Sequence, residues 1–190
     1  MFRKIKVSDI KQVAKLHREE LSGFLSELGR DFLEKFYKVS LIIPEIFTIV
    51  IEEKKQILGF ASGAVRLRGL YKKIFMKDPL GFIFSLLSYS ITHPGKIFKL
   101  TKTMVYPGFE SDIPELLTIV IDKNQRNRGL GRKLFLAAVK EFKKRGIDDF
   151  RISVYKRLPA NEFYKKIGLK LEKQFDFMGE KMNYYRYKEG

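Results

Sequence analysis

The chain has 190 residues, 45% of them hydrophobic and 32% charged, and its formal net charge is +16. This composition is typical of one globular domain with a sizeable core and excludes a disordered chain. The absence of cysteine excludes disulfides and thiol nucleophiles, and no apolar run reaches the roughly 18 residues that a membrane-spanning helix needs.

The positive charge predicts attraction to polyanions such as nucleotides, nucleic acid or anionic lipid headgroups. It argues against a strongly basic peptide as the preferred substrate, because like charges slow the encounter. The first ten residues, MFRKIKVSDI, lack the apolar core of a signal peptide. We therefore expect a cytoplasmic protein.

The N-terminal part predicts one strand followed by helices. Residues 2–7 have strand character, and Ser8 or Asp9 is expected to cap a helix whose apolar positions recur at helical spacing. A second helical pattern follows Gly23 and is expected to break near Gly29.

A hairpin is predicted next, because residues 47–51 and 57–66 flank the polar sequence EEKKQ. Gly59 and Gly63 lie in its second strand. Glycine at such positions allows a bulge or the close approach of another backbone.

Residues 67–113 interrupt this pattern with a predicted helical insertion. Asp78 and Pro79 form a helix start, residues 81–91 are apolar apart from three serines, and residues 96–105 form a second helical segment. Between residues 66 and 104 there are eight lysines and arginines and one acid, a net charge of +7. Three roles remain open for this insertion: a lid or wall on the core, a dimer contact, or a membrane-surface element.

The C-terminal part alternates strands and helices. A strand at residues 116–121 leads through a basic, glycine-containing turn into an amphipathic helix at residues 131–145. Such a turn at a helix N-terminus is suited to hold an anion, since backbone N–H groups are unpaired there and the helix dipole is positive. The remaining elements are a strand at 150–154, a helix from about Pro159, a turn at Gly168, and strands at 171–175 and 182–187.

Two sequence motifs in this part resemble those of the GNAT (GCN5-related N-acetyltransferase) superfamily. The family's cofactor signature, Gln or Arg, two residues, Gly, one residue, Gly or Ala, is matched by Arg126-Asn127-Arg128-Gly129-Leu130-Gly131. Its second signature is matched by Ala160-Asn161-Glu162-Phe163-Tyr164 followed by Gly168-Leu169. The resemblance implies an α/β (α+β) fold with a mixed, mostly antiparallel sheet flanked by helices. We expect a single acetyltransferase domain over residues 1–190, with 67–113 inserted.

The resemblance also implies acetyl-CoA as co-substrate. Backbone N–H groups of the loop would hold the pyrophosphate, basic side chains would add positive field, and peptide groups of the preceding strand would pair with the pantetheine arm. One strand N–H would polarise the thioester carbonyl. The expected cofactor-binding residues are Ile119, Val120, Ile121, Arg126, Asn127, Arg128, Gly129, Leu130, Gly131, Arg132, Lys133, Ala160 and Phe163.

Two residues are expected to be catalytic. Glu115 precedes Arg126 by eleven residues (126 − 115), the spacing at which many family members place a general base for the acceptor amine. Tyr164 falls on the family's tyrosine that protonates the departing thiolate, and a phenol with a pKa of about 10 is a proton donor at neutral pH. Glu110 and Tyr155 are weaker substitutes for these two residues.

One position departs from the family pattern. Arg157 replaces the asparagine that often bonds the pantetheine arm three residues before the motif alanine, and Asn161 lies on the wrong side of that alanine to replace it. Arg157 is left open as a contact to CoA phosphate, to substrate or to solvent. His17 and His93 have no metal-ligand spacing, so we expect no metal site.

The function favoured by these observations is direct transfer of an acetyl group from acetyl-CoA to a primary amine, with a small anionic metabolite or amino sugar as acceptor. A protein or RNA-linked amine is the alternative acceptor, and a non-catalytic acyl-CoA- or nucleic-acid-binding protein is the alternative class. We expect no specific nucleic-acid partner. A weak membrane-surface contact through the insertion and a homodimer are left open.

Overall fold

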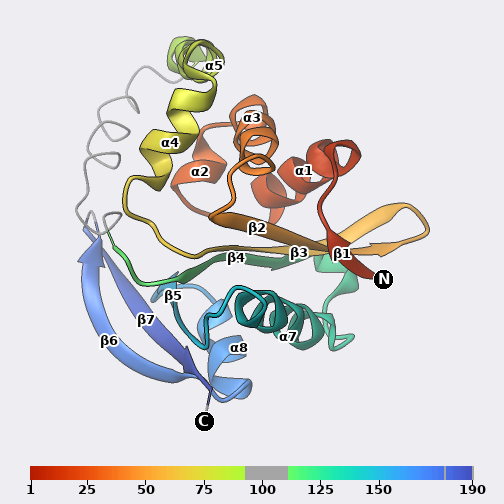
Figure 1. Ribbon diagram of the computed structural model, residues 1–190, viewed down its shortest axis with the longest axis vertical. Helices are drawn as coiled ribbons and strands as arrows, with labels where there is room; N and C mark the ends of the chain where they lie inside the picture. Colours follow the sequence, from red (N-terminus) through yellow and green to blue (C-terminus); the bar gives the residue numbers. More distant parts are fainter. Residues whose placement is uncertain (93–110, 178, 190) are drawn as a thin grey trace.

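The computed structural model describes residues 1–92, 111–177 and 179–189. Within them, seven strands form one sheet in the order β1-β2-β3-β4-β5-β7-β6, in which only β4 and β5 are parallel (Figure 1). The predicted mixed, mostly antiparallel sheet is therefore confirmed. The strands are β1 Phe2–Lys4, β2 Ile46–Glu53, β3 Gln56–Ala64, β4 Glu115–Ile121, β5 Asp149–Tyr155, β6 Lys170–Phe177 and β7 Glu180–Lys188.

Helices cover both faces of the sheet (Figure 1). One face carries the N-terminal helices and the start of the insertion, and its core includes Val13, Leu33 and Phe60. The other face carries the two later helices, and its core includes Leu134, Phe142 and Ile152. The helices are α1 Ile10–Glu20, α2 Phe24–Glu27, α3 Arg30–Ser40, α4 Leu70–Lys77, α5 Pro79–Thr92, α7 Leu130–Lys143 and α8 Ala160–Lys166.

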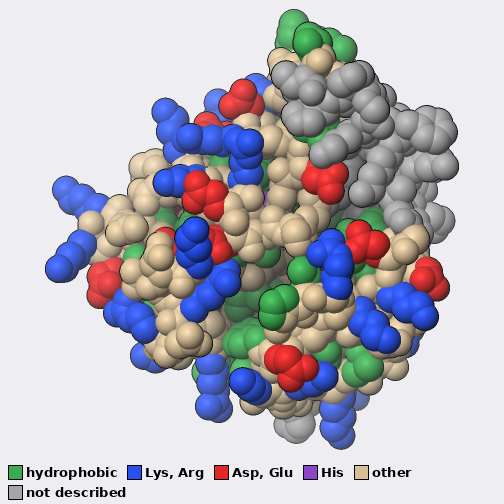
Figure 2. Space-filling model, turned by 180° about the vertical axis from the view of Figure 1, so that it is seen from behind, with side chains coloured by type: hydrophobic (Ala, Val, Ile, Leu, Met, Phe, Trp, Pro, Cys, Tyr) green, Lys and Arg blue, Asp and Glu red, His purple; other side chains and the backbone are tan. Residues whose placement is uncertain are grey.

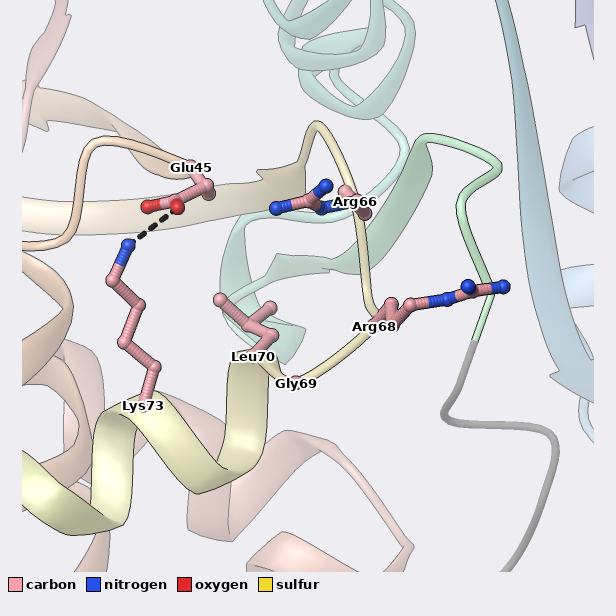
Figure 3. A pocket seen from close by; sticks show the side chains of 6 residues that line it. All are labelled: Glu45, Arg66, Arg68, Gly69, Leu70 and Lys73. Carbon is pink, nitrogen blue, oxygen red and sulfur yellow. Dashed lines mark hydrogen bonds and ion pairs between the residues drawn. The ribbon is translucent and has the colours of Figure 1, made fainter.

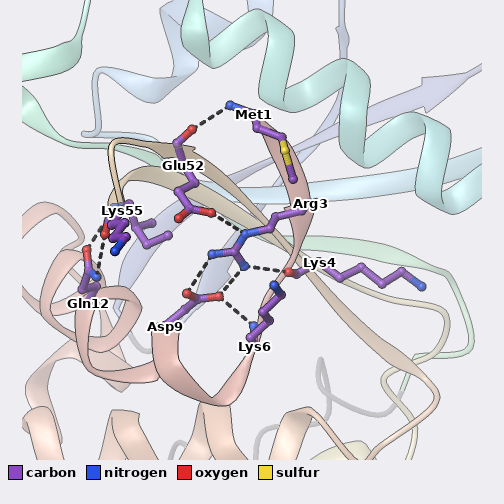
Figure 4. Close-up of polar contacts among 9 residues, drawn as sticks. Met1, Arg3, Lys4, Lys6, Asp9, Gln12, Glu52 and Lys55 are labelled. Carbon is purple, nitrogen blue, oxygen red and sulfur yellow. Dashed lines mark hydrogen bonds and ion pairs between the residues drawn. The ribbon is translucent and has the colours of Figure 1, made fainter.

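The first strand is shorter than the predicted range of residues 2–7, because Val7 begins a turn of 3₁₀-helix. Asp9 causes this early end: its carboxylate accepts hydrogen bonds from the guanidinium of Arg3 at 2.6 and 2.9 Å and from the backbone N–H of Lys6 at 2.7 Å. Arg3 also donates to Glu52 of β2 at 2.6 Å (Figure 4). These contacts fix the chain between β1 and α1.

Both glycines of β3 mark close packing, as expected. A Cβ atom at Gly59 would lie 2.5 Å from the carbonyl oxygen of Val120 on β4. One at Gly63 would lie 2.4 Å from the ring of Phe47, and the register between β3 and β4 shifts beside it. The predicted break between the second and third helices is also confirmed, since Gly29 has a φ of 87°.

The insertion begins with a helix that the sequence pattern did not predict, α4, and continues with the predicted one, α5. Asp78 caps α5 by accepting a hydrogen bond from the backbone N–H of Gly81 at 3.0 Å. The expectations for residues 96–105, His93 and Glu110 lie outside the described residues. Within the described ranges, no single helix is long and apolar enough to cross a membrane, although α4 and α5 pass that test as a pair bent by 95°.

Candidate active site

The site is built around a split in the sheet between β4 and β5. In the described chain these parallel strands have one registered pair, Glu115 with Arg151, beside which the backbone N–H of Arg151 donates to the carbonyl of Pro114 at 2.9 Å. Beyond that pair the strands are no longer registered, so β4 has one edge without a neighbouring strand. Figure 2 shows the molecular surface hollowed near the middle of the view, with hydrophobic side chains inside the hollow.

The free edge of β4 exposes peptide groups to the split. The backbone N–H of Asp122 donates to the carbonyl of Leu58 on β3 at 2.9 Å. Because backbone groups alternate along a strand, the peptide groups of Ile121 and Ile119 face away from β3 and toward the split. The side chain of Val120, which is 4% exposed, packs into the core beneath the N-terminal helices. The expected pantetheine track therefore has its peptide groups available.

The loop after β4 has the geometry of an anion cradle. Asn127 and Gly129 both have positive φ, at 62° and 71°, and the first hydrogen bond of α7 runs from the N–H of Lys133 to the carbonyl of Gly129 at 3.2 Å. Residues 130–132 lie between Gly129 and Lys133, so their N–H groups have no acceptor in the preceding turn of α7. A Cβ atom on Gly131 would lie 3.2 Å from the ring of Phe163 on α8, so the glycine lets the two helices approach closely.

The cationic side chains of the loop are exposed. Arg126 donates to Glu20 of α1 at 2.5 Å and to the carbonyl of Ile121 at 3.3 Å. Arg128 contacts Gln125 and lies 3.9 Å from Glu53. Arg132 and Lys133 lie on the first turn of α7, exposed to solvent. Leu130, between the two glycines, packs against the core of this face.

Glu115, the expected general base, lies buried at the point where the sheet splits. Its carboxylate is 2.5 Å from Nε of Arg151 and accepts a hydrogen bond from the hydroxyl of Ser153 at 2.7 Å, both on β5. Burial raises the pKa of Glu115, while the charge of Arg151 and these hydrogen bonds act in the opposite direction. Burial, helped by the charge of Glu115, also raises the pKa of Tyr71 on α4.

Tyr164, the expected acid, lies on α8 and is 4% exposed. Its ring packs against Phe163 and Tyr185, with centroids 5.3 and 5.4 Å apart. Burial raises the pKa of its hydroxyl, so the phenol keeps its proton at neutral pH. Ala160 begins α8 and packs against the same core.

Asn161 is fully used in holding α8 to the sheet. Its amide donates to the carbonyls of Tyr155, Lys156 and Leu158 at 2.6 to 3.1 Å. Its oxygen accepts from Asn183 at 2.6 Å and Tyr185 at 3.0 Å. This network gives Asn161 a structural role.

Arg157 lies above the ring of Tyr155, at 5.0 Å from its centroid, and donates to Glu180 at 2.6 Å. It therefore ties the end of β5 to the final hairpin. Burial raises the pKa of the Tyr155 hydroxyl.

A second positively charged feature lies where β3 ends and α4 begins. A cavity of about 190 Å³ is lined there by Glu45, Arg66, Arg68, Gly69, Leu70 and Lys73. Lys73 donates to Glu45 at 2.5 Å, and Figure 3 shows the guanidinium of Arg66 directed toward that carboxylate. The cavity is near the split, because Ala64 at the end of β3 is paired with Glu115.

Sequence reasoning did not find three partners of the expected site residues, Glu20, Arg151 and Ser153, nor did it single out the residues that line the cavity. Arg151 and Ser153 are two residues apart on β5 and therefore lie on the same face, beside Glu115. Nothing in the sequence reveals which strand lies next to β4. Glu20 is 106 residues from Arg126. Only its position in the last turn of an amphipathic helix distinguishes it.

Comparison with solved structures defines the class of fold. The PaiA N-acetyltransferase of Thermoplasma acidophilum, solved with coenzyme A, is similar over 100% of this chain and 98% of its own, with 16% identity and a TM-score of 0.63. YncA of Salmonella typhimurium, solved with its cofactor acetyl-CoA, is similar over 99% and 92%, with 13% identity and a TM-score of 0.63. The ribosomal-protein-alanine N-acetyltransferase of Brucella melitensis is similar over 100% and 99%, with 13% identity and a TM-score of 0.64. These are acetyltransferase folds.

The sequence itself matches the Acetyltransferase (GNAT) family over residues 10–169. The chain therefore belongs to the GNAT family of acetyltransferases, and the predicted class, an acetyl-CoA-dependent N-acyltransferase, is confirmed. No match was found among curated proteins. Family and fold leave the acceptor amine to be inferred from the residues of this chain.

Proposed function

We propose that this chain acetylates the primary amine of a small, negatively charged metabolite, such as a phosphorylated amino sugar. The observation that carries the proposal is the cavity at the start of α4, which is lined by three cations, Arg66, Arg68 and Lys73, and by one carboxylate, Glu45. Its volume of about 190 Å³ fits a phosphate or carboxylate group with part of its carrier. The cavity is separate from the cationic loop at the other end of β4, which leaves that loop for the cofactor.

The chain's residues fit coenzyme A. Gly129 and Gly131 open the backbone at the start of α7, where unpaired N–H groups would hold the pyrophosphate, and Arg126, Arg128, Arg132 and Lys133 supply the positive field. The peptide groups of Ile119 and Ile121 would hold the pantetheine arm as an added strand. Acetyl-CoA supplies the acetyl group as an activated thioester.

The catalytic roles follow from the environment of two side chains. Glu115 accepts the proton of the acceptor ammonium, because burial raises the pKa of its carboxyl toward that of a useful base. Tyr164 keeps a proton on its hydroxyl at neutral pH, since burial raises its pKa. The residues 1–190 act as a single domain in this proposal, with α4 of the insertion forming one wall of the acceptor cavity.

The acceptor proposal is tested by comparing glucosamine 6-phosphate with glucosamine, with release of CoA as the readout. We expect kcat/KM to be at least tenfold higher for the phosphorylated sugar. Arg66→Gln is expected to remove most of that difference, because it should raise KM for glucosamine 6-phosphate and leave KM for glucosamine unchanged. Lys144→Gln, which removes an exposed lysine after α7, is the matched control.

Equal efficiency on both sugars, unchanged by Arg66→Gln, would reject the anionic acceptor. Acetylation of a peptide N-terminus or an aminoacyl-tRNA in place of both sugars would assign the alternative acceptor class. Binding of CoA without turnover on the phosphorylated sugar would also reject the proposed acceptor.

A further inference from the structure

Helix α5 presents an apolar face to solvent. Its opposite face is anchored in the protein, where Phe82 is 1% and Tyr89 9% exposed. The solvent-facing side chains recur at intervals of four, three and four residues, which places them on one side of the helix. They are Leu80 at 68%, Phe84 at 67%, Leu87 at 56% and Ile91 at 83% exposure.

Two serine hydroxyls of α5 are hydrogen-bonded within the helix, so placing them in an apolar environment would not leave them unsatisfied. None of its fourteen residues is charged. The hydroxyl of Ser85 donates to the carbonyl of Gly81 at 3.0 Å, and that of Ser90 donates to the carbonyl of Leu86 at 2.6 Å. Serine hydroxyls bonded in this way to the preceding helical turn need no water partner.

The segment that leads into α5 is basic in sequence, although two of its cations are ion-paired, Lys73 with Glu45 and Arg68 with Asp112. Between residues 66 and 92 there are five lysines and arginines and one acid, Asp78, so the net charge is +4 (5 − 1). Lys72 and Lys77 are exposed on α4, and Met76 between them is 63% exposed. Figure 2 shows hydrophobic side chains at the tip of the molecule, with both basic and acidic side chains below them.

The position of α5 suits a flat surface. It lies at the end of the molecule, beyond α4 (Figure 1), and the two helices are bent by 95°. A helix of 14 residues is about 21 Å long at about 1.5 Å per residue, shorter than the roughly 30 Å hydrocarbon core of a bilayer. It can lie in the plane of an interface while α4 runs back toward the protein.

We propose that α5 and α4 dock this enzyme on an anionic lipid bilayer, with the apolar face of α5 at the boundary of the acyl chains and the lysines of α4 at the headgroups. Charge complementarity favours this occupant. A second copy of the chain would place two surfaces of net positive charge against each other in a two-fold interface. Anionic headgroups instead attract each lysine, and lipid receives the apolar side chains.

Flotation of the full chain with vesicles tests the proposal. We expect binding to phosphatidylcholine vesicles containing about one-third phosphatidylglycerol, little binding to pure phosphatidylcholine, and loss of binding at high salt. The double variant Phe84→Ser/Leu87→Ser and the double variant Lys72→Gln/Lys77→Gln should each weaken the partition coefficient at least tenfold.

Matched controls distinguish binding through α4 and α5 from nonspecific hydrophobic or electrostatic adsorption to vesicles. Leu136→Ser removes a leucine that is 54% exposed on α7, and Lys140→Gln/Lys144→Gln removes two exposed lysines there. Both controls should bind vesicles nearly as the parent does. All variants should keep the parent's melting temperature, because the changed side chains are exposed. The α4 and α5 variants should also keep its CoA affinity, because they lie outside the cofactor loop and α7.

Two results would overturn the proposal. One is vesicle binding that neither α5 nor α4 variants change more than the α7 controls. The other is a dimer in sedimentation analysis that Phe84→Ser/Leu87→Ser dissociates, which would make the α5 face a protein contact. Neither result depends on which amine the enzyme acetylates, so the acceptor proposal is tested separately.

Discussion

Glu115 has both a proposed catalytic role and a structural one. Its carboxylate is buried at the split and bonded to Arg151 and Ser153 of β5. It therefore joins the two strands at the one registered pair that they have in the described chain. Removing the carboxylate alone breaks the buried ion pair between Glu115 and Arg151, and breaking such a pair typically costs about 3–5 kcal/mol of stability. A loss of activity in a Glu115 variant could consequently result from the lost base or from the lost stability.

A double variant separates them. Glu115→Gln is expected to lower kcat by about 10²–10³, to abolish the fall in kcat/KM toward acid that a titrating base produces, and to lower the melting temperature. Adding Arg151→Met should restore much of the stability, because the buried charge is gone, without restoring kcat. Recovery of turnover in the double variant would show that Glu115 acts only through the structure.

At the scale of elements, hydrophobic periodicity and glycine positions predicted most of the helices and strands, whereas the type of sheet was implied by the family resemblance. The pattern after Gly23 predicted a helix broken at Gly29, and the EEKKQ hairpin and β4 were found within one or two residues. Helix α4 was missed. Its first residue follows Gly69, which has a left-handed φ of 66° and provides no capping side chain. The apolar Met76 lies on its exposed side, which disturbs the helical spacing of apolar residues.

The candidate site was predicted less completely, for a physical reason. The cofactor loop is local in sequence, so its glycines and arginines reveal it. The partners of Glu115 and Arg126 come from β5 and α1, and no local pattern specifies which elements lie side by side. These long-range pairs are set by the order of the strands in the assembled sheet.

Gly59 determines how closely β3 and β4 approach. Gly59→Ala is expected to destabilise the protein by about 1–3 kcal/mol, because its Cβ would lie 2.5 Å from the carbonyl oxygen of Val120. Since the other edge of β4 is the proposed pantetheine track, CoA affinity should fall as well. Denaturant unfolding and CoA titration measure the two effects.

Gly23→Ala is the control for that experiment. Its Cβ would lie 3.8 Å from the ring of Tyr155, an ordinary contact, and its backbone is extended with a φ of 163°. We expect its unfolding free energy to change little. Equal losses in both variants would show that the contact with β4 is not the cause.

At the scale of the whole molecule, the two cores on either side of the sheet differ in their buried polar groups. The core under the N-terminal helices and the insertion contains a neutral histidine, His17, which is 5% exposed. Its Nδ1 is 2.7 Å from the hydroxyl of Tyr37 on α3, and its ring stacks on Phe60 of β3. His17 thus connects α1, α3 and the sheet, and its protonation would affect the folding of the domain as a unit.

The contribution of His17 to the stability of the protein should fall as the pH decreases from about 6.5 to about 4. Burial lowers the pKa of His17 from 6.5 to about 4. Between these values the unfolded chain binds a proton that the folded chain does not, so the unfolded state gains up to about 3 kcal/mol. Below about 4 both states are protonated and this contribution no longer changes.

Comparison of the parent with His17→Gln isolates this contribution. Glu115 acts in the opposite direction in the same pH range, because burial raises its pKa and favours the folded state in acid. Glu115 titrates in both proteins, so the difference in unfolding free energy between them reports His17. Denaturant unfolding at pH 4.5, 5.5 and 7 should give a smaller loss of stability toward acid in His17→Gln than in the parent. Parallel pH dependence in the two proteins would mean that His17 is protonated in the folded state or that water reaches it.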